Sequence, residues 1–194
     1  MTQASRAHGG ISFGARLLKI GSWTLLRLPE SASAKLPSRG MVMVQGTING
    51  FHFTSPLEPD GRKGHWLSVE KNMLRGSKAH PGDAVALEIG VSQEWPEPGI
   101  PGDLKKALRD SEKAYETWKD ITPAAHWEWI RWIRSTKSPE TRKKRIEVAS
   151  SKLEAGARRP CCFNSSTCTE TDVSSNGVLL DLDSPKLGTR SETS

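Results

Sequence analysis

The sequence predicts an α+β protein, in which a small antiparallel β-barrel is followed by a three-helix C-terminal segment, with disordered tails. Residues 23–94 hold five or six short strand-like runs, separated by turn residues about every 8–12 positions, a spacing typical of small barrels and sandwiches. Residues 103–157 hold three amphipathic stretches with helix start signals. Only 35% of the 194 residues are hydrophobic and the mean hydropathy is −0.53, too little apolar surface for a chain that is folded throughout its length.

The strand pattern is clearest at two expected hairpins. Residues 41–48, MVMVQGTI, alternate with period two and are followed by Asn49, Gly50 and the run FHFTS. Asn-Gly between two such runs is the strongest short hairpin signal, because both central turn residues need positive φ. A second hairpin is expected around residues 58–64, where Pro-Asp-Gly supplies turn chemistry, and a last strand over residues 84–91, AVALEIGV.

Helix start signals follow a proline-rich linker at residues 95–102. Thr122 and Ser138 each precede a proline, and this pairs an N-cap side chain with the residue best suited to the first helical position. The chain therefore changes from strands to helices at the linker. The expected helices cover residues 103–119, 123–136 and 139–155.

Composition predicts the nature of the segments outside the barrel and the helices, and the cellular location of the protein. The first 22 residues are basic but lack the apolar core of about 7–15 residues found in a secretory signal. No run approaches the roughly 18–20 apolar residues that span a bilayer. We therefore expect a cytoplasmic protein without a membrane span. The predicted parts are a disordered tail (1–22), a barrel (23–94), a linker (95–102), a basic three-helix segment (103–157), a Cys-containing extension (158–168) and a disordered tail (169–194).

Several long motifs resemble those of a known family. In the strand half they are LPSRGMVMVQGTINGFHF, LEPDGRKGHWLSV and HPGDAVALEI, and WPEPGIPGDLKKAL spans the linker. In the helical half the motif begins TPAAHWEWIRWIRSTKSPETRKKRIEVAS. These residues resemble the YdeI/OmpD-associated family, also described as bacteriocin-protection proteins, over residues 23–168. The resemblance implies a barrel domain of unknown function, similar to the split barrels of some DNA-binding antitoxin-type regulators, and an OmdA-type helical segment. It implies an association with stress and supplies no catalytic residues.

The third expected helix carries four consecutive cations in its first two turns, Arg142, Lys143, Lys144 and Arg145. The helix dipole makes a cation there unfavourable by about 0.3–1 kcal/mol at an exposed site. We interpret the run as a binding site for an anion, such as phosphate, a nucleic-acid backbone or a lipid headgroup. The alternative is a solvated basic face, with Arg142 paired to a carboxylate of the barrel.

The second expected helix, AAHWEWIRWIRST, has apolar side chains around more than half of its circumference. An amphipathic surface helix needs an apolar arc of only about 100°. We therefore expect it to be central, wedged between the barrel and its neighbours, with Arg131 on its narrow polar strip. In the alternative, Trp127 and Trp132 are exposed beside arginines and form a stacking surface for single-stranded nucleic acid or a membrane interface.

Single residues elsewhere carry weaker signals. Arg39, in LPSRG, is expected either to contact an anion at the barrel mouth or to pair with Glu58 or Glu70. His65 begins a strand after a glycine-rich turn, and His52 and His80 also lie in or beside strands and turns. Two of these histidines together with Glu58 or Asp60 would suit metal binding or acid–base chemistry. Arg39 and His65 both remain open between a functional and a structural role.

Three cysteines crowd near the end of the chain, Cys161, Cys162 and Cys168. A structural zinc site needs four ligands, so His126 would have to complete the set. The alternatives are a redox role and simple packing as reduced thiols. No phosphate-binding loop, nucleophile elbow, zinc-protease motif or dinucleotide fingerprint is present. The sequence therefore predicts no metal site and no cofactor.

These observations favour a non-enzymatic, stress-associated binding protein that engages a polyanion. The formal net charge is +6, and residues 103–160 hold 15 basic and 9 acidic residues, so the charge concentrates in the helical segment. Two alternatives stay open. One is a small-ligand or enzymatic site between barrel and helices that uses His65 and Arg142, and the other is a protein–protein interaction module. The sequence sets no oligomeric state.

Overall fold

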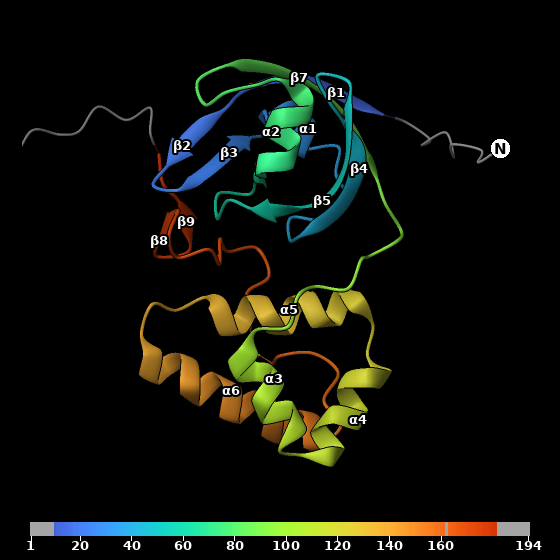
Figure 1. Cartoon of the computed structure of the whole chain (residues 1–194), viewed down its shortest axis with the longest axis vertical. Helices are drawn as coiled ribbons and strands as arrows, with labels where there is room; N and C mark the ends of the chain where they lie inside the picture. Colours follow the sequence, from blue (N-terminus) through green and yellow to red (C-terminus); the bar gives the residue numbers. More distant parts are fainter. Residues whose placement is uncertain (1–9, 162, 182–194) are drawn as a thin grey trace, which may run out of the picture.

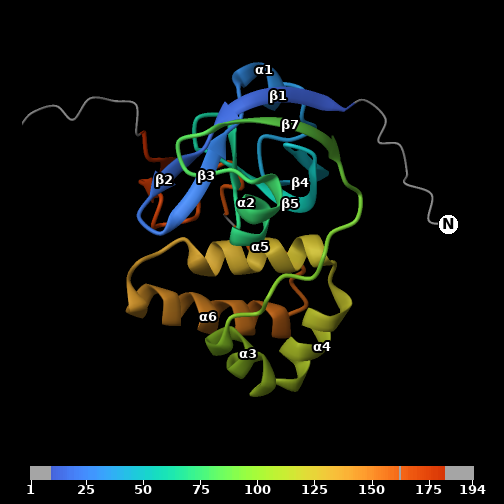
Figure 2. The same ribbon diagram turned by 45° about the horizontal axis from the view of Figure 1, so that its top comes forward.

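The barrel and the helices form two stacked halves, and the helix Pro123–Arg134 (α5) lies between the barrel and the other long helices (Figures 1 and 2). The structure is a computed structural model that describes residues 10–161 and 163–181. The predicted fold class is confirmed, since a nearly closed antiparallel barrel is followed by helices. No described helix combines the length and the apolar character needed to cross a bilayer.

The barrel is one antiparallel sheet of seven strands, ordered β1-β7-β4-β5-β6-β3-β2. The predicted Asn-Gly hairpin is confirmed, because Ile48 pairs with Phe51 across a turn in which Asn49 and Gly50 have φ values of 46° and 83°. The strands are Ile11–Arg16 (β1), Leu18–Ile20 (β2), Trp23–Arg27 (β3), Val42–Ile48 (β4), Phe51–Pro59 (β5), His65–Ser68 (β6) and Ala84–Val91 (β7).

The barrel starts at Ile11, so the prediction of a disordered tail over residues 1–22 is wrong for its second half. Strands β1 and β2 form one bent segment that pairs first with β7 and then with β3. The change of partner falls at Leu17, whose N–H donates to the Asp83 carbonyl (2.9 Å) and whose carbonyl accepts from Gly82 (2.8 Å). This segment is what brings the two edges of the sheet together. Residues 1–9 lie outside the described part of the chain.

Two short helices accompany the strands, Glu30–Ser33 (α1) and Lys71–Ser77 (α2). Met73 of α2 is buried in the same apolar cluster as the inward side chains of the barrel strands. The α2 helix therefore belongs to the barrel and contributes to its core.

The helical half contains four helices in place of the predicted three. The expected helix over residues 103–119 ends at Arg109 and a second begins at Glu112, because Ser111 acts as an N-cap and its hydroxyl accepts from the Ala114 amide (3.3 Å). The four helices share one apolar cluster, separate from that of the barrel. They are Gly102–Arg109 (α3), Glu112–Asp120 (α4), α5 and Pro139–Glu154 (α6).

The prediction of disorder from residue 169 onward is also wrong for residues 169–181. Residues 163–181, which we call the C-terminal strap, run back to the barrel and form the hairpin Ser174–Ser175 (β8) and Val178–Leu179 (β9). Val173 and Leu179 are buried against a cluster that includes Trp66 of the barrel. Residues 182–194 lie outside the described part.

Strand β4 lies so close to β7 at Gly46 that no side chain fits there without a shift of the backbone. A Cβ atom built there would meet the Glu88 carbonyl oxygen and would lie 2.8 Å from Ile89 Cα. We expect Gly46→Ala to lower the free energy of unfolding by about 1–3 kcal/mol, because rigid backbone must shift. Urea denaturation followed by Trp fluorescence measures this. The control is Gly99→Ala, whose Cβ has no neighbour within 4 Å and which should change stability by less than about 0.5 kcal/mol.

Candidate anion-binding surface

Two N-caps set the directions of α5 and α6, as predicted from the Thr-Pro and Ser-Pro pairs. The Thr122 hydroxyl accepts from the Ala125 amide (3.3 Å), and the Ser138 hydroxyl accepts from the Thr141 amide (3.2 Å). The helix α6 therefore begins at Pro139, and the predicted basic run occupies its first two turns.

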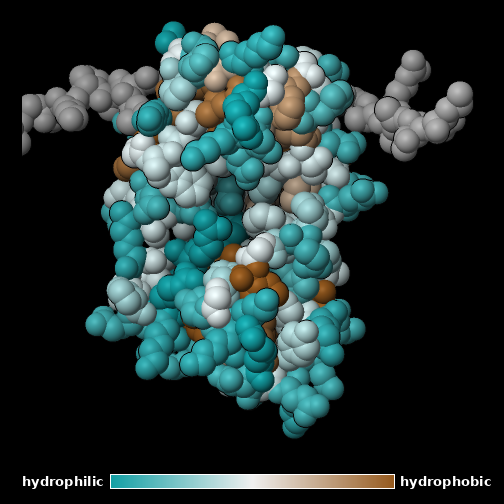
Figure 3. Space-filling model, viewed as in Figure 1, coloured by the Kyte–Doolittle hydropathy of each residue, from teal (hydrophilic) through white to brown (hydrophobic). Residues whose placement is uncertain are grey.

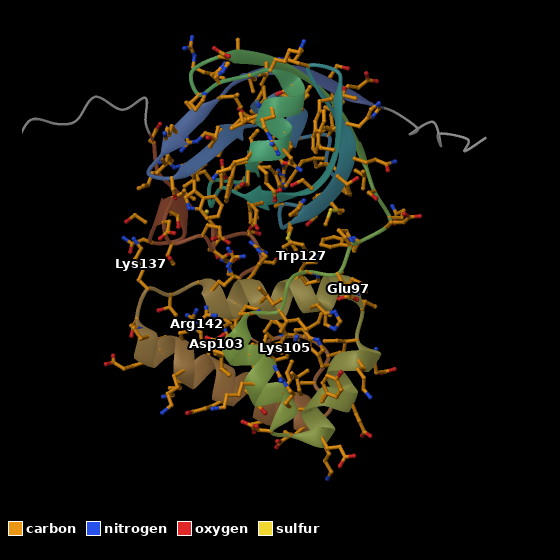
Figure 4. The ribbon with its side chains drawn as sticks, viewed as in Figure 1. Glu97, Asp103, Lys105, Trp127, Lys137 and Arg142 are labelled. Atoms are coloured by element: carbon orange, nitrogen blue, oxygen red, sulfur yellow. The ribbon has the colours of Figure 1, made fainter. Side chains whose placement is uncertain are left out.

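Arg142 is committed to a structural ion pair. Its guanidinium donates twice to Asp103, from Nε to Oδ2 (2.7 Å) and from Nη2 to Oδ1 (3.0 Å), which joins α6 to the start of α3 (Figure 4). The hydrogen bonds from Arg142 lower the pKa of the Asp103 carboxyl from its ordinary value. The carboxylate that neutralises Arg142 thus comes from α3 and not from the barrel.

Arg145 also serves the fold. Its Nη1 donates to the Trp132 carbonyl (2.7 Å) and to the Ser135 hydroxyl (2.6 Å), and its guanidinium lies 5.6 Å from the Trp132 ring centroid. Burial lowers the pKa of Arg145. Arg145 therefore ties α6 to the end of α5, and an anion would have to compete with these contacts.

The two lysines between these arginines differ from them in having no ion-pair partner within the described residues. Lys143 and Lys144 are both exposed, and neither takes part in an ion pair within the described residues. The same contrast holds more widely, because every ion pair among the described residues uses arginine or histidine and none uses lysine. Those pairs are formed by Arg27, Arg62, His80, His126, Arg131, Arg134, Arg142, Arg158 and Arg159.

Further exposed cations lie near α6, and the sequence interpretation did not include them. Lys137 precedes α6, and Lys105, Lys106 and Arg109 lie on α3, the helix joined to α6 by the Arg142–Asp103 pair. Figure 4 shows Arg142 next to Asp103, Lys105 further along α3, and Lys137 at the connection between α5 and α6. Their signal in the sequence was the high basic content of residues 103–160, and the contact between α3 and α6 brings these two basic helices side by side. We call Lys105, Lys106, Arg109, Lys137, Lys143 and Lys144 the helical basic surface.

The predicted stacking residues are largely occupied by intramolecular contacts. Trp127 is half-buried, and its indole N–H donates to the Pro96 carbonyl of the linker (2.9 Å). Trp132 is half-buried as well, packs edge-on against Trp129 (5.9 Å between ring centroids) and lies under Arg145. The helix is central, as predicted, and these two rings do not form an exposed aromatic strip.

Arg131, on the predicted polar strip of α5, is buried, because only 1% of this residue is exposed. Its Nε donates to Oε2 of Glu58 on β5 (2.9 Å), and its Nη2 donates to the Thr167 carbonyl of the strap (3.3 Å). Glu58 is 7% exposed, so both charges are withdrawn from water. Beside it, Arg134 pairs with the buried Glu170 of the strap (2.7 Å). Burial raises the pKa of the Glu170 carboxyl.

His65 and Arg39 have structural partners. His65 is fully buried, with Nδ1 3.3 Å from the Ser33 hydroxyl and Nε2 3.0 Å from the Gly40 carbonyl, and burial lowers its pKa. Arg39 donates to the carbonyls of Ser33 and Lys63 (3.3 Å each), and not to Glu58 or Glu70. The structure therefore does not bring His65 and Arg142 together in a cleft.

The cysteines do not gather into a metal centre within the described residues, which contain no group of three or more potential metal ligands. Cys168 of the strap is buried in the cluster that includes Trp66, and burial raises its pKa, whereas Cys161 is exposed. The prediction for Cys162 lies outside the described residues. His126 is occupied, with one ring nitrogen 2.7 Å from Glu97 and the other 2.7 Å from the Trp118 carbonyl.

The barrel and the helical half form a two-part protein, as the sequence motifs suggest. Residues 13–89 match a domain of unknown function (DUF1905), and residues 97–156 match the family described as bacteriocin-protection, YdeI or OmpD-associated. No curated protein matches the chain. The chain belongs to the YdeI/OmpD-associated family, with an N-terminal domain of unknown function.

The buried Arg131–Glu58 pair predicts a large effect of breaking it. We expect Arg131→Met to lower the free energy of unfolding by about 3–5 kcal/mol, because Glu58 is left buried without a counter-charge. The double variant Arg131→Met/Glu58→Gln should recover part of this loss. Urea denaturation of the four proteins in the cycle measures the coupling. Arg159→Gln, which breaks an exposed pair, is the control and should cost at most about 1 kcal/mol. A similar loss of stability in Arg131→Met and Arg159→Gln would contradict the structural role of the buried Arg131–Glu58 pair.

The buried His65 predicts a pH dependence of stability. Its folded-state pKa lies below the ordinary value of 6.5, so the unfolded chain binds the proton more readily. The contribution of His65 to the free energy of unfolding is fully present above about pH 6.5. It declines as the pH falls toward the folded-state pKa, by at most about 1.4 kcal/mol per pH unit. Urea midpoints measured at several pH values should fall less steeply in His65→Gln than in the wild type. Parallel curves would contradict the prediction.

Proposed function

We propose that this protein is a non-enzymatic, stress-associated binding protein of the cytoplasm, and that its helical basic surface binds a polyanion, for which a nucleic-acid backbone is the best candidate. The observation that carries the proposal is the division between arginines and lysines. The arginines Arg131, Arg134, Arg142 and Arg145 are held in structural contacts, whereas the exposed lysines nearby have no ion-pair partner within the described residues.

Lysines of this kind suit phosphate groups better than base edges. A lysine ammonium is a compact charge on a flexible stem, and contacts with phosphate supply most sequence-independent affinity for nucleic acids. No exposed aromatic strip accompanies the surface, because Trp127 and Trp132 are engaged within the protein. The proposed binding is therefore mainly electrostatic.

A protein-docking module receives less support from the surface. The large hydrophobic residues exposed among the described positions are Val91, Tyr115 and Leu180, which are scattered over the chain. The face in Figure 3 is mostly hydrophilic, with small separate apolar patches. Scattered apolar residues of this kind are normal on a monomer and do not mark an interface.

The proposal predicts binding that weakens with salt and depends on Lys143 and Lys144. We expect a labelled single-stranded oligonucleotide and a duplex of equal length to bind at low salt. In Lys143→Gln/Lys144→Gln, the slope of log affinity against log salt should fall by about two, about one unit for each lost phosphate contact. Fluorescence anisotropy over a salt series measures both quantities. This pair is a sharper test than Arg142 and Arg145, whose loss would disturb the fold.

The matched control removes the same charge elsewhere. Lys35 and Lys78 are exposed on the barrel half, so Lys35→Gln/Lys78→Gln should keep the wild-type salt slope. Absence of binding at low salt, or equal slopes for the two double variants, would overturn the proposed role of the helical basic surface.

A further inference from the structure

A groove of about 770 Å³ lies on the barrel, between the turn that joins β2 to β3 and the helix α2. Figure 2 shows β2, β3 and α2 beside one another at this end of the barrel, above the helical half. Its volume falls within the range of about 300–1,000 Å³ that is usual for small-molecule sites. The groove is separate from the helical basic surface, since none of its lining residues lies beyond Pro81.

Three cations line the groove without a counter-charge that neutralises them. Lys19 comes from β2, and Lys71 and Arg75 come from α2. Lys71 and Arg75 are four residues apart and share one face of the helix, where like charges repel. None of the three forms an ion pair within the described residues, and Glu70 is the one acidic residue of the lining. The groove thus has a net charge of about +2, and its cations all border the same space.

An aromatic ring lies beside these charges. Trp23, half-buried, lines the groove and packs edge-on against the fully buried Trp66, with 6.2 Å between ring centroids and 72° between ring planes. The buried Trp66 therefore supports the indole of Trp23 on one side. Leu74 adds apolar surface to the same lining. A planar ring can stack on such an indole whatever its hydrogen-bonding pattern, because every aromatic base has a π face.

We propose that this groove binds a small aromatic phosphate of the nucleoside monophosphate class. The ring of the ligand stacks on Trp23, and its phosphate lies among Lys19, Lys71 and Arg75. A phosphate monoester carries a charge of about −1.5 to −2 at neutral pH, which matches the excess positive charge of the lining. A neutral nucleoside would leave the cations unbalanced, and inorganic phosphate would leave the indole uncovered. The phosphate also relieves the repulsion between Lys71 and Arg75.

The test uses the full chain and isothermal titration calorimetry with three probes: AMP, adenosine and inorganic phosphate. We expect AMP to bind at one site per chain, and adenosine and phosphate each to bind at least about tenfold more weakly, since each supplies only one of the two contacts. Binding of AMP no tighter than that of inorganic phosphate would overturn the aromatic contact, and binding no tighter than that of adenosine would overturn the phosphate contact.

Two variants connect the binding to this groove. Lys71→Gln/Arg75→Gln should weaken AMP binding at least about tenfold while leaving thermal stability equal or higher, because two repelling charges are removed from one helix face. Trp23→Leu should weaken AMP binding by about the same factor and leave phosphate binding unchanged. Unchanged AMP affinity in the Lys71/Arg75 double variant would overturn the proposal, and circular dichroism confirms that each variant is folded.

The matched control is Lys143→Gln/Lys144→Gln, which removes two helix lysines outside the groove. This variant should bind AMP as the wild type does, so the groove and the helical basic surface can fail or succeed separately. Loss of AMP binding in this control to the same degree as in Lys71→Gln/Arg75→Gln would show non-specific attraction to a basic protein, and would overturn the groove as a site.

Discussion

The buried ion pair between Arg131 and Glu58 is the constraint on which the arrangement of the two halves depends. The residues are 73 positions apart and lie on α5 and β5, and each would be strongly destabilised if buried without the other. Separation of barrel and helices would expose or orphan both charges. The strap contributes the Thr167 carbonyl to the same guanidinium and places Phe163 near it, with 5.5 Å from Arg131 Cζ to the ring centroid. Three segments distant in sequence therefore meet at one charged group.

Arginines form most of the structural ion pairs among the described residues, and the geometry of the guanidinium explains why lysines do not take part in them. A guanidinium presents several donors in a fixed plane, so it can satisfy a carboxylate and a carbonyl at once, as Arg131 does. Arg27 likewise donates to two carbonyls of the strap and forms an ion pair with Asp181. A lysine ammonium gains less from such fixed geometry because its stem must be ordered for each contact. Exposed lysines such as Lys143 and Lys144 thus keep their charge available to a partner in solution.

Local signals in the sequence predicted the parts of the fold that depend on local chemistry. The Asn49-Gly50 turn and the caps at Thr122 and Ser138 each rest on residues within a few positions of one another, and all three are present. The first strand was missed because the basic composition of the N-terminus outweighed the period-two apolar positions from Ile11 to Leu17, and its pairing partner β7 lies some 70 residues away. The burial of Arg131 was missed because its partner Glu58 is likewise distant in sequence, 73 positions away. A helical wheel records polarity, and it cannot show that Glu58 meets that polar side chain.

The two proposed sites share one physical feature, which is cations in positions that are electrostatically unfavourable in the free protein. Lys143 and Lys144 lie at the positive end of the α6 dipole, and Lys71 and Arg75 repel one another along α2. Where cations serve the fold in this protein they meet carboxylates, carbonyls or an indole ring, as Arg142 and Arg145 show within the same two turns of helix. Cations left unpaired beside them lower stability unless an anion arrives. The same energetic argument therefore supports both proposed sites, while the indole of Trp23 distinguishes the barrel groove, where we propose an aromatic ligand.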